Sequence, residues 1–236
     1  MSRTRRSADR FAGFILAGVV SCSLIGAVSA APPQRYDDLL AQAKQNASAV
    51  DFTALRYAYA ESAQYNPYDP NDAELYKSMV NAMNARDCTS AMKHAQAILE
   101  KNYVRINAHV ASAICYRQLN QVQAAAHHDA MARGLMDSIL ASGNGATAQT
   151  AFVVIAVDEE YSAIAKLSLK SGRQRLLKND GHRFDVLDVT DKDGRTSTLY
   201  FNIDRLFTGT RDRIRAVSKR GSNPPLGNTY RHRIAS

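Results

Sequence analysis

Apolar residues recur at helical spacing on both sides of Tyr103, and these two stretches form the clearest pattern in the sequence. The first stretch, which Asp87 or Thr89 can cap, places four apolar residues on one helical face, namely Ala91, Ala95, Ile98 and Leu99. The second stretch does the same with Ile106, Val110, Ala113 and Ile114. Helices joined by so short a connection must lie antiparallel, so we expect the two apolar faces to pack on each other.

Three further helical patterns surround this pair. The two earlier ones, the second capped by Asp51, carry their apolar residues at Tyr36, Leu39, Leu40 and Ala43 and at Phe52, Leu55, Tyr59 and Ala60. Pro67 and Pro70 then interrupt helix formation, because proline lacks an amide donor and disfavours helical angles in the preceding residue. The last helix should end near Leu140, before the glycine-rich stretch 142–145, with its inner face at Ala132, Leu135, Met136 and Ile139.

After residue 145 the pattern becomes that of strands. The continuous apolar run 151–157 predicts a buried strand, and Asp158 is expected to cap a short helix with Glu159 and Glu160 in its first turn. Turn sequences at 179–181 and 191–194 separate three strands of a β-meander, and a break in alternation between Val186 and Leu187 predicts a bulge. The predicted fold class is α+β: an N-terminal helical hairpin array followed by a small antiparallel β-meander with one short helix.

The first thirty residues have the pattern of an export signal. Four arginines precede an apolar run from Phe11 to Val28, and small residues before Ala31 suit cleavage. A retained anchor, the twin-arginine route and a lipoprotein acylated at Cys22 are alternatives, although the chain stays apolar beyond that cysteine. We expect a periplasmic or secreted protein with a signal peptide over 1–30, a helical region over 31–141, a C-terminal α/β subdomain over 142–208 and a basic disordered tail over 209–236.

The net charge of +8 belongs to the ends of the chain. The first thirty residues hold four basic and one acidic side chain, and residues 211–236 hold seven and one, which leaves nineteen basic and twenty acidic residues for 31–210. Residues 31–210 are therefore nearly neutral, which argues against a nucleic-acid interface spread over a folded face. The tail either makes weak contact with anionic lipid or cell-wall polymer, or remains solvated.

Cys88 and Cys115 are the cysteines that remain once the signal is removed. Cys88 opens one helix of the central pair and Cys115 lies near the end of its antiparallel neighbour, so the hairpin brings them level. In an oxidising compartment we expect a disulfide, worth about 3 to 4 kcal/mol of folding stability on the chain-entropy argument. Two ordinary buried thiols are the alternative.

The central pair is similar to a tetratricopeptide unit, a 34-residue helix pair. With Asp72 as position one, three residues occupy expected positions, namely Ala91, Tyr116 and Ala125. The sequence departs from that pattern at Ala95, where an aromatic residue is usual, and at Tyr103, where a proline is usual. We interpret the array as tetratricopeptide-like, against any other array of helical hairpins.

A second resemblance covers most of residues 36–207. Its motifs are Asp51-Phe52-Thr53-Ala54-Leu55-Arg56, Tyr59, Ser62, Tyr65-Asn66-Pro67-Tyr68, Ser142-Gly143-Asn144-Gly145, Ala151-Phe152, Asp158-Glu159-Glu160-Tyr161, Gln174, Phe184-Asp185 and Leu199-Tyr200-Phe201-Asn202-Ile203. Together they resemble a bacterial exported family catalogued as domain of unknown function 4919, with Asn144 where an aspartate is expected. The resemblance implies an exported protein with a tetratricopeptide-like front and a β-rich end, and it carries over no catalytic residue.

Two groups of residues are candidates for binding. Tyrosines gather early in the chain, and Tyr59, Tyr65, Tyr68 and Tyr76 either line a groove for an extended peptide or pack the first hairpin onto the second. Glu159, Glu160 and Tyr161 at the short helix form the second group. The histidines at positions 94, 109, 127 and 128 show no ligand spacing, so we predict neither a metal site nor a cofactor.

Two functions remain open. A helical array offers a concave surface and the sequence has no dense set of reactive groups, so we favour a non-catalytic scaffold for a protein or peptide partner in the cell envelope. The alternative is a carboxylate-dependent envelope hydrolase in which Glu160 acts with His182 or Asp185. Glu159 and Glu160 cannot act together on one substrate bond in the paired geometry of glycoside hydrolysis, because adjacent helical residues point about 100° apart. A charge-complemented helix start explains the same glutamates without catalysis.

Overall fold

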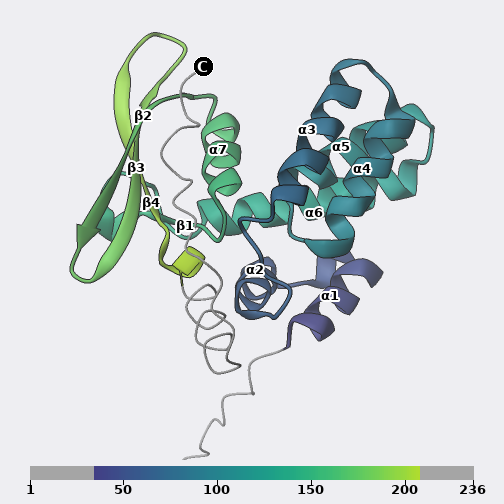
Figure 1. Ribbon diagram of the computed structural model, residues 1–236, viewed down its shortest axis with the longest axis horizontal. Coiled ribbons are helices and arrows are strands. Elements are labelled where there is room, and N and C mark those ends of the chain that lie inside the picture. The colour runs from purple at the N-terminus through teal and green to yellow at the C-terminus, as the bar shows by residue number, and fades with distance from the viewer. Residues whose placement is uncertain (1–34, 208–236) are drawn as a thin grey trace, which may run out of the picture. The chain divides into compact units, whose positions relative to one another are not determined.

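The computed structural model describes residues 35–207 and confirms the predicted α+β class, with paired helices followed by a mostly antiparallel sheet and a short helix (Figure 1). The helical part contains α1 (Tyr36–Gln45), η1 (Ala47–Ala49), α2 (Phe52–Glu61), α3 (Pro70–Asn84), α4 (Cys88–Lys101), α5 (Ile106–Gln118) and α6 (Val122–Leu140). The C-terminal part contains η2 (Ala148–Thr150), β1 (Phe152–Val153), α7 (Val157–Lys166), β2 (Lys170–Asn179), β3 (His182–Thr190) and β4 (Thr196–Asn202). The predicted signal peptide with Cys22 and the predicted tail lie outside the described residues.

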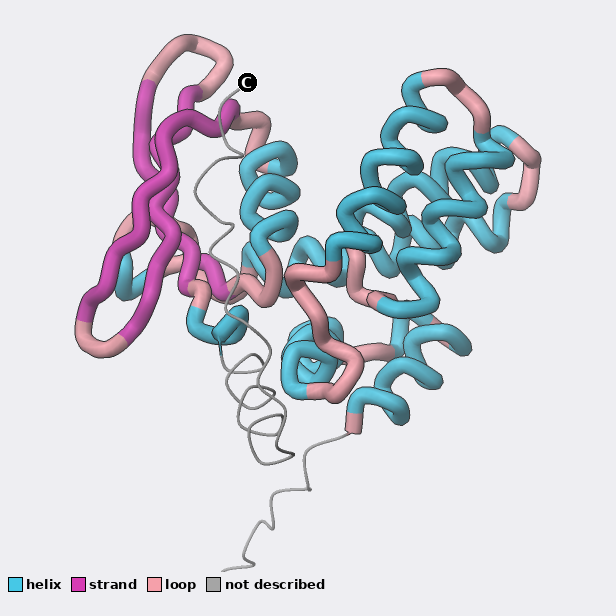
Figure 2. Tube along the Cα trace, viewed as in Figure 1, coloured by secondary structure: helices cyan, strands magenta, loops and turns pink. Residues whose placement is uncertain are grey.

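Aspartates fix where three of the helices begin. Asp51, Asp69 and Asp87 each accept a hydrogen bond from a backbone amide in the first turn of α2, α3 and α4, at 2.9, 2.9 and 3.1 Å. Pro70 is the first residue of α3, where an amide donor has no helical partner in any case. Helices α3 to α6 then run up and down beside one another (Figure 2).

Burial in the central pair follows the prediction fully in α4 and in part in α5, where Ile106 and Ala113 are buried. The four predicted residues of α4 are all buried. Val110 of α5 is 41% exposed instead, and the residues that α5 buries include Ala108, Ala111 and Ser112. The prediction was wrong for Val110 because α5 packs against α3, α4, α6 and α7, so small residues on several sides are covered and burial does not follow a single apolar stripe.

The predicted disulfide between Cys88 and Cys115 is present. It joins the first residue of α4 to the last turn of α5, with 5.2 Å between the two Cα atoms. Ala82 and Ala91 pack around it in a small apolar cluster. The bond therefore closes the α4–α5 hairpin on the side opposite its turn.

The sheet has the strand order β1-β4-β3-β2, in which only the β1–β4 pairing is parallel. Asp180 and Gly181 both have positive φ angles, of 49° and 82°, as a tight hairpin turn between β2 and β3 requires. The predicted bulge at Val186–Leu187 was wrong, since β3 pairs with β4 there without a break and the irregularity lies in β2 after Ser171. Alternation is lost because both faces of the sheet are covered, so Val186 and Leu187 are both buried.

The chain turns into α7 earlier than predicted. β1 contains only Phe152 and Val153, and α7 begins at Val157 with Ala156 as its N-cap residue, so Asp158 is not the cap. α7 packs between the sheet and helices α5 and α6 (Figure 1). One hydrophobic cluster runs through both parts of the fold and includes Leu39, Leu55, Ile98, Leu135, Ile164, Leu187 and Phe201. Within residues 35–207, no helix has the length and apolar character needed to span a membrane.

Candidate functional site

The first turn of α7 carries three consecutive acidic residues, Asp158, Glu159 and Glu160. Negative charge is favoured there because the unpaired amides of a helix N-terminus carry partial positive charge. Successive helical side chains point about 100° apart, so the three carboxyl groups face different surroundings. Glu159 and Asp158 each form an ion pair with a different arginine, whereas Glu160 lies beside another carboxyl group.

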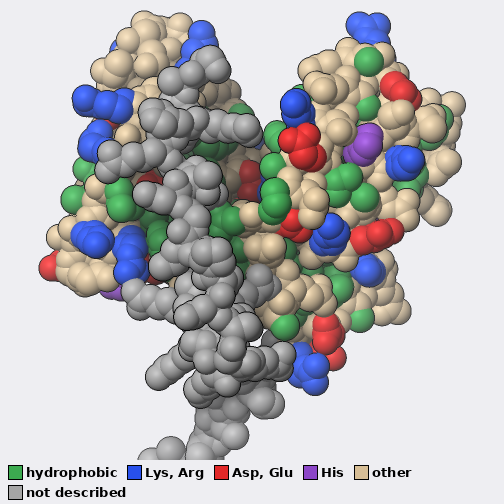
Figure 3. All heavy atoms as spheres, viewed as in Figure 1, with side chains coloured by type: hydrophobic (Ala, Val, Ile, Leu, Met, Phe, Trp, Pro, Cys, Tyr) green, Lys and Arg blue, Asp and Glu red, His purple; other side chains and the backbone are tan. Residues whose placement is uncertain are grey.

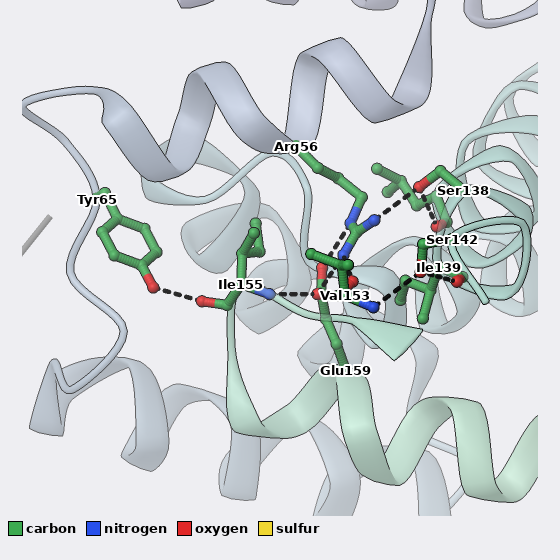
Figure 4. Close-up of polar contacts among 9 residues, drawn as sticks. Arg56, Tyr65, Ser138, Ile139, Ser142, Val153, Ile155 and Glu159 are labelled. Carbon is green, nitrogen blue, oxygen red and sulfur yellow. Dashed lines mark hydrogen bonds and ion pairs between the residues drawn. The ribbon is translucent and has the colours of Figure 1, made fainter. Parts of the chain in front are cut away.

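Glu159 forms a buried ion pair with Arg56 of α2 (Figure 4). Arg56 donates through Nε and Nη2 to the two carboxylate oxygens at 2.9 and 2.6 Å, and it also donates to Ser138 Oγ and to the carbonyl of Val153, both at 3.0 Å. The amide of Ile155 donates to Glu159 Oε2 at 2.8 Å. Within residues 35–207, every nitrogen and oxygen atom of the two charged groups has a hydrogen-bond partner, so the pair connects α2, α6, β1 and α7 rather than offering a ligand site.

Asp158 takes part in a second ion-pair cluster. Arg105 Nη1 lies 2.9 Å from Asp158 Oδ1 and 3.1 Å from Asp72 Oδ2, and its guanidinium lies 5.1 Å above the ring of Tyr76. Burial raises the pKa of Asp158 to about 6, against the opposing charge of Arg105. The cavity among these residues has a volume of about 10 Å³, which is the size of one water molecule rather than of a substrate.

The third acidic residue, Glu160, differs from the other two in its surroundings. Its side chain is fully buried, and neither carboxyl oxygen makes a hydrogen bond of normal geometry within residues 35–207. Burial, together with the neighbouring carboxylate of Asp185, raises the pKa of Glu160 to about 9, and burial also raises the pKa of Asp185. Gln174 Nε2 donates to Asp185 at 2.8 Å and Tyr161 donates to Gln174 at 3.4 Å. Glu160 is therefore a neutral acid at neutral pH.

The structure places only one of the two predicted catalytic partners, Asp185 and not His182, beside Glu160. Asp185 lies beside Glu160, as described above, whereas His182 Nδ1 lies 2.6 Å from Asp204 Oδ2. A carboxylic acid next to a carboxylate can exchange a proton with it. The carboxyl group of Glu160 has no exposed surface, however, so a substrate bond cannot reach it without movement of α7 or the sheet.

A groove of about 590 Å³ lies on the helical part of the fold. Its apolar and aromatic lining comes from α4, α5, α6 and the α4–α5 connection, with Met92, Leu99, Tyr103, Tyr116 and His128. Lys44 of α1 and Lys93 and Glu100 of α4 add charges to the lining. An apolar groove with a few polar groups is the usual form of a binding site.

Three histidines lie close together beside this groove, although their positions in the sequence show no ligand spacing. His109 Nδ1 lies 2.8 Å from His128 Nδ1, and His127 Nε2 lies 2.9 Å from the hydroxyl of Tyr103. The ring of Tyr116 stacks on His128, with 5.4 Å between centroids and 18° between planes. Burial lowers the pKa of His109 to about 3 and that of His128 to about 4. An antiparallel arrangement of α5 and α6 across their short turn predicts that His109 lies close to His127 and His128.

Comparison with protein families finds a match to one family over residues 31–211. That family is described as "Domain of unknown function (DUF4919)". The chain belongs to this family. The description assigns no activity, and neither the curated proteins nor the solved structures contain a match to the chain.

In this DUF4919 domain the predicted binding residues divide between the core and the surface. Tyr59 and Tyr65 are buried, and the hydroxyl of Tyr65 donates to the carbonyl of Ile155, as packing of the first hairpin requires (Figure 4). Tyr68 and Tyr161 are 41% and 39% exposed. Tyr76 is half-buried beneath Arg105. The groove described above shares none of these tyrosines, so their role in binding stays a prediction.

Proposed function

We propose that the DUF4919 domain is a non-catalytic scaffold that binds an extended segment of a protein or peptide partner in the cell envelope. The observation that carries the proposal is the groove of about 590 Å³ along α4, α5 and α6. Aromatic and aliphatic side chains supply the apolar contact area that peptide recognition needs, and Lys44, Lys93 and Glu100 supply polar selectivity. Over the helices in Figure 3, basic and acidic side chains are interspersed, which suits a protein partner better than nucleic acid.

The proposal is tested by selecting peptides from a random phage-displayed library against the purified protein. Peptides that are enriched are synthesised, and their affinity is measured by fluorescence polarisation. Met92→Glu, which places a charge in the apolar lining, should weaken binding by at least about tenfold. Val122→Glu is the matched control because Val122 is 73% exposed and outside the groove. Failure to enrich any peptide, or equal binding by the Met92 variant, would overturn the proposal.

The envelope location and the tetratricopeptide-like character belong to the same proposal. The Cys88–Cys115 disulfide supports an oxidising compartment, and the neighbouring antiparallel helices support a repeat-like array. Cleavage before Ala31 gives a soluble periplasmic or secreted protein, and acylation of Cys22 would give a lipoprotein. Intact-mass measurement of the protein from the native envelope distinguishes the two, and a mass that includes the first thirty residues contradicts both.

Two further roles are tested separately. The alternative hydrolase would use Glu160, and the raised pKa beside Asp185 is the observation that favours it, but complete burial of Glu160 leaves binding as the better-supported function. Loss of hydrolysis of envelope polymers in a Glu160→Gln protein that remains folded would establish catalysis. Contact of the basic residues 209–236 with anionic lipid is tested by vesicle sedimentation of the protein with and without this segment. Equal sedimentation of the two proteins would contradict that contact.

A further inference from the structure

Hydrogen bonds fix which nitrogen atoms carry protons in the histidine pair beside the groove. His109 Nε2 lies 2.8 Å from the carbonyl oxygen of Tyr103, and a carbonyl only accepts, so Nε2 of His109 carries the hydrogen. His109 is fully buried and has no acidic partner within residues 35–207, so it is neutral and its Nδ1 is a bare acceptor. The 2.8 Å contact with His128 therefore requires His128 to donate from Nδ1.

This arrangement leaves the other nitrogen of His128 as an acceptor. A neutral imidazole that carries its hydrogen on Nδ1 has a lone pair on Nε2. Within residues 35–207, Nε2 of His128 makes no hydrogen bond, and it is not enclosed by protein. The His128 ring lines the groove, and stacking on Tyr116 holds its plane. The groove thus contains an acceptor of fixed position and tautomer.

The charged residues that line the groove indicate which ligand group would bind near this acceptor. Lys44 and Lys93 have no carboxylate within ion-pair distance among the described residues, and Lys44 Nζ lies 5.3 Å above the ring of Tyr103. Glu100 is the acidic residue of the lining, and it accepts a hydrogen bond from Gln96 at 3.3 Å. The two lysines therefore favour a segment that carries a carboxylate.

Resting on the proposed function, the geometry points to His128 Nε2 as the specificity-determining group of the groove. It accepts a hydrogen bond from a hydroxyl or amide N–H of an extended peptide whose carboxylate contacts Lys44 or Lys93. A ligand without such a donor leaves Nε2 desolvated and unpaired, which weakens its binding.

The tautomers are measured directly by heteronuclear NMR of the histidine ring nitrogens in the purified protein at neutral pH. We expect His128 to carry its proton on Nδ1 with a bare Nε2, and His109 to show the reverse, with resonances assigned from single-site variants. A proton on Nε2 of His128, or on both of its nitrogens, would overturn the inference. This measurement needs no ligand, so it is independent of the proposed function.

Two matched variants test the recognition step with the synthetic peptides selected by the unaltered protein. His128→Asn keeps a donor near the Nδ1 position and loses the acceptor at Nε2, whereas His128→Gln places its amide near the Nε2 position. The asparagine variant should bind at least about tenfold more weakly, and the glutamine variant should keep most of the affinity. Thermal unfolding must show that both variants fold.

The selected peptides supply the remaining test. They should be enriched in Asp or Glu together with residues that offer hydroxyl or amide donors, and Lys93→Ala should weaken their binding. Equal affinity for the unaltered protein and His128→Asn would refute the inference while leaving the groove as a binding site. Failure to select any peptide would remove the proposed function and its ligand, even with the expected tautomers.

Discussion

At the scale of single residues, Arg56 and Glu159 connect elements that are far apart in the sequence. Both side chains are buried and together they contact α2, α6, β1 and α7. Arg56→Ala leaves a buried carboxylate without its cation, so the free energy of unfolding should fall by about 3 to 5 kcal/mol. Urea denaturation followed by circular dichroism measures the change.

Replacing both members of this pair should cost less than removing one. Arg56→Met combined with Glu159→Leu leaves no buried charge unpaired, so much of the stability lost in Arg56→Ala should return. Arg195→Ala is the control, because that arginine is exposed and its removal should change stability little. A loss in Arg56→Ala no larger than in the control would show that the buried pair does not hold the fold.

Glu160 gives the opposite expectation, namely that removing an acid stabilises the protein. The folded chain keeps Glu160 protonated, because its pKa rises from 4.5 to about 9, whereas the unfolded chain ionises it at neutral pH. Glu160→Gln keeps the shape of the neutral acid and should add on the order of 3 kcal/mol at mildly alkaline pH. Glu74→Gln on the exposed face of α3 is the control. A destabilised Glu160→Gln protein would show that the carboxylate form is the one the fold requires.

At the scale of elements, the connection from α6 to the sheet depends on a close approach of backbone. A Cβ atom on Gly143 would lie 2.3 Å from the carbonyl oxygen of Thr150 and 2.6 Å from that of Ala151. The amides of Asn144 and Gly145 donate to Thr150 in the same turn. Gly143→Ala should therefore lower the free energy of unfolding by about 1 to 3 kcal/mol, measured by urea denaturation.

Gly134 of α6 is the matched comparison. A Cβ there would lie 2.0 Å from the ring of Phe52, which is a side chain and can shift. Gly134→Ala should cost less than Gly143→Ala, and Phe52→Ala should compensate for Gly134→Ala but not for Gly143→Ala. Equal costs at both glycines would mean that the backbone of the connection adjusts freely.

Elements whose cause is local were predictable from sequence. Asp51 and Asp87 cap helices, Asp180-Gly181 makes a hairpin turn, and Cys88 meets Cys115 because a short connection sets the register of α4 and α5. Features that depend on several neighbours were not predictable. Val110 and Val186 were misjudged because burial there depends on how many elements surround them, which periodicity does not report.

The candidate site was predicted even less completely than the fold. Glu159, Glu160 and Tyr161 were singled out, and Asp185 was named with His182 as a possible partner of Glu160. The partner of Glu159 was not predicted, because Arg56 lies 103 positions away along the chain. The histidines of α5 and α6 carry no ligand spacing, because they bond to one another and to tyrosine groups rather than to a shared ion. Long-range polar contacts of this kind leave no periodic trace in sequence.

For the molecule as a whole, two kinds of buried group act on stability in opposite directions as pH changes. Glu160 and Asp158 have pKa values of about 9 and 6, raised from 4.5 and 3.8, so their contribution is complete at low pH and is lost as pH rises. His109 and His128 have pKa values of about 3 and 4, lowered from 6.5. The unfolded chain therefore binds protons first as pH falls below 6.5, and stability falls with it.

These signs predict a maximum of stability in mildly acidic solution. Between about pH 4.5 and 6.5 the gain from the acids and the loss from the histidines nearly cancel. Above this range Glu160 lowers the free energy of unfolding by up to about 1.4 kcal/mol per pH unit, and below it the histidines lower the free energy. Urea unfolding at closely spaced pH values measures the curve. Glu160→Gln should flatten its alkaline side and, because the histidines are then no longer fully cancelled, should make stability rise with pH between about 4.5 and 6.5. A maximum at alkaline pH, or the same alkaline slope in both proteins, would contradict a buried neutral Glu160.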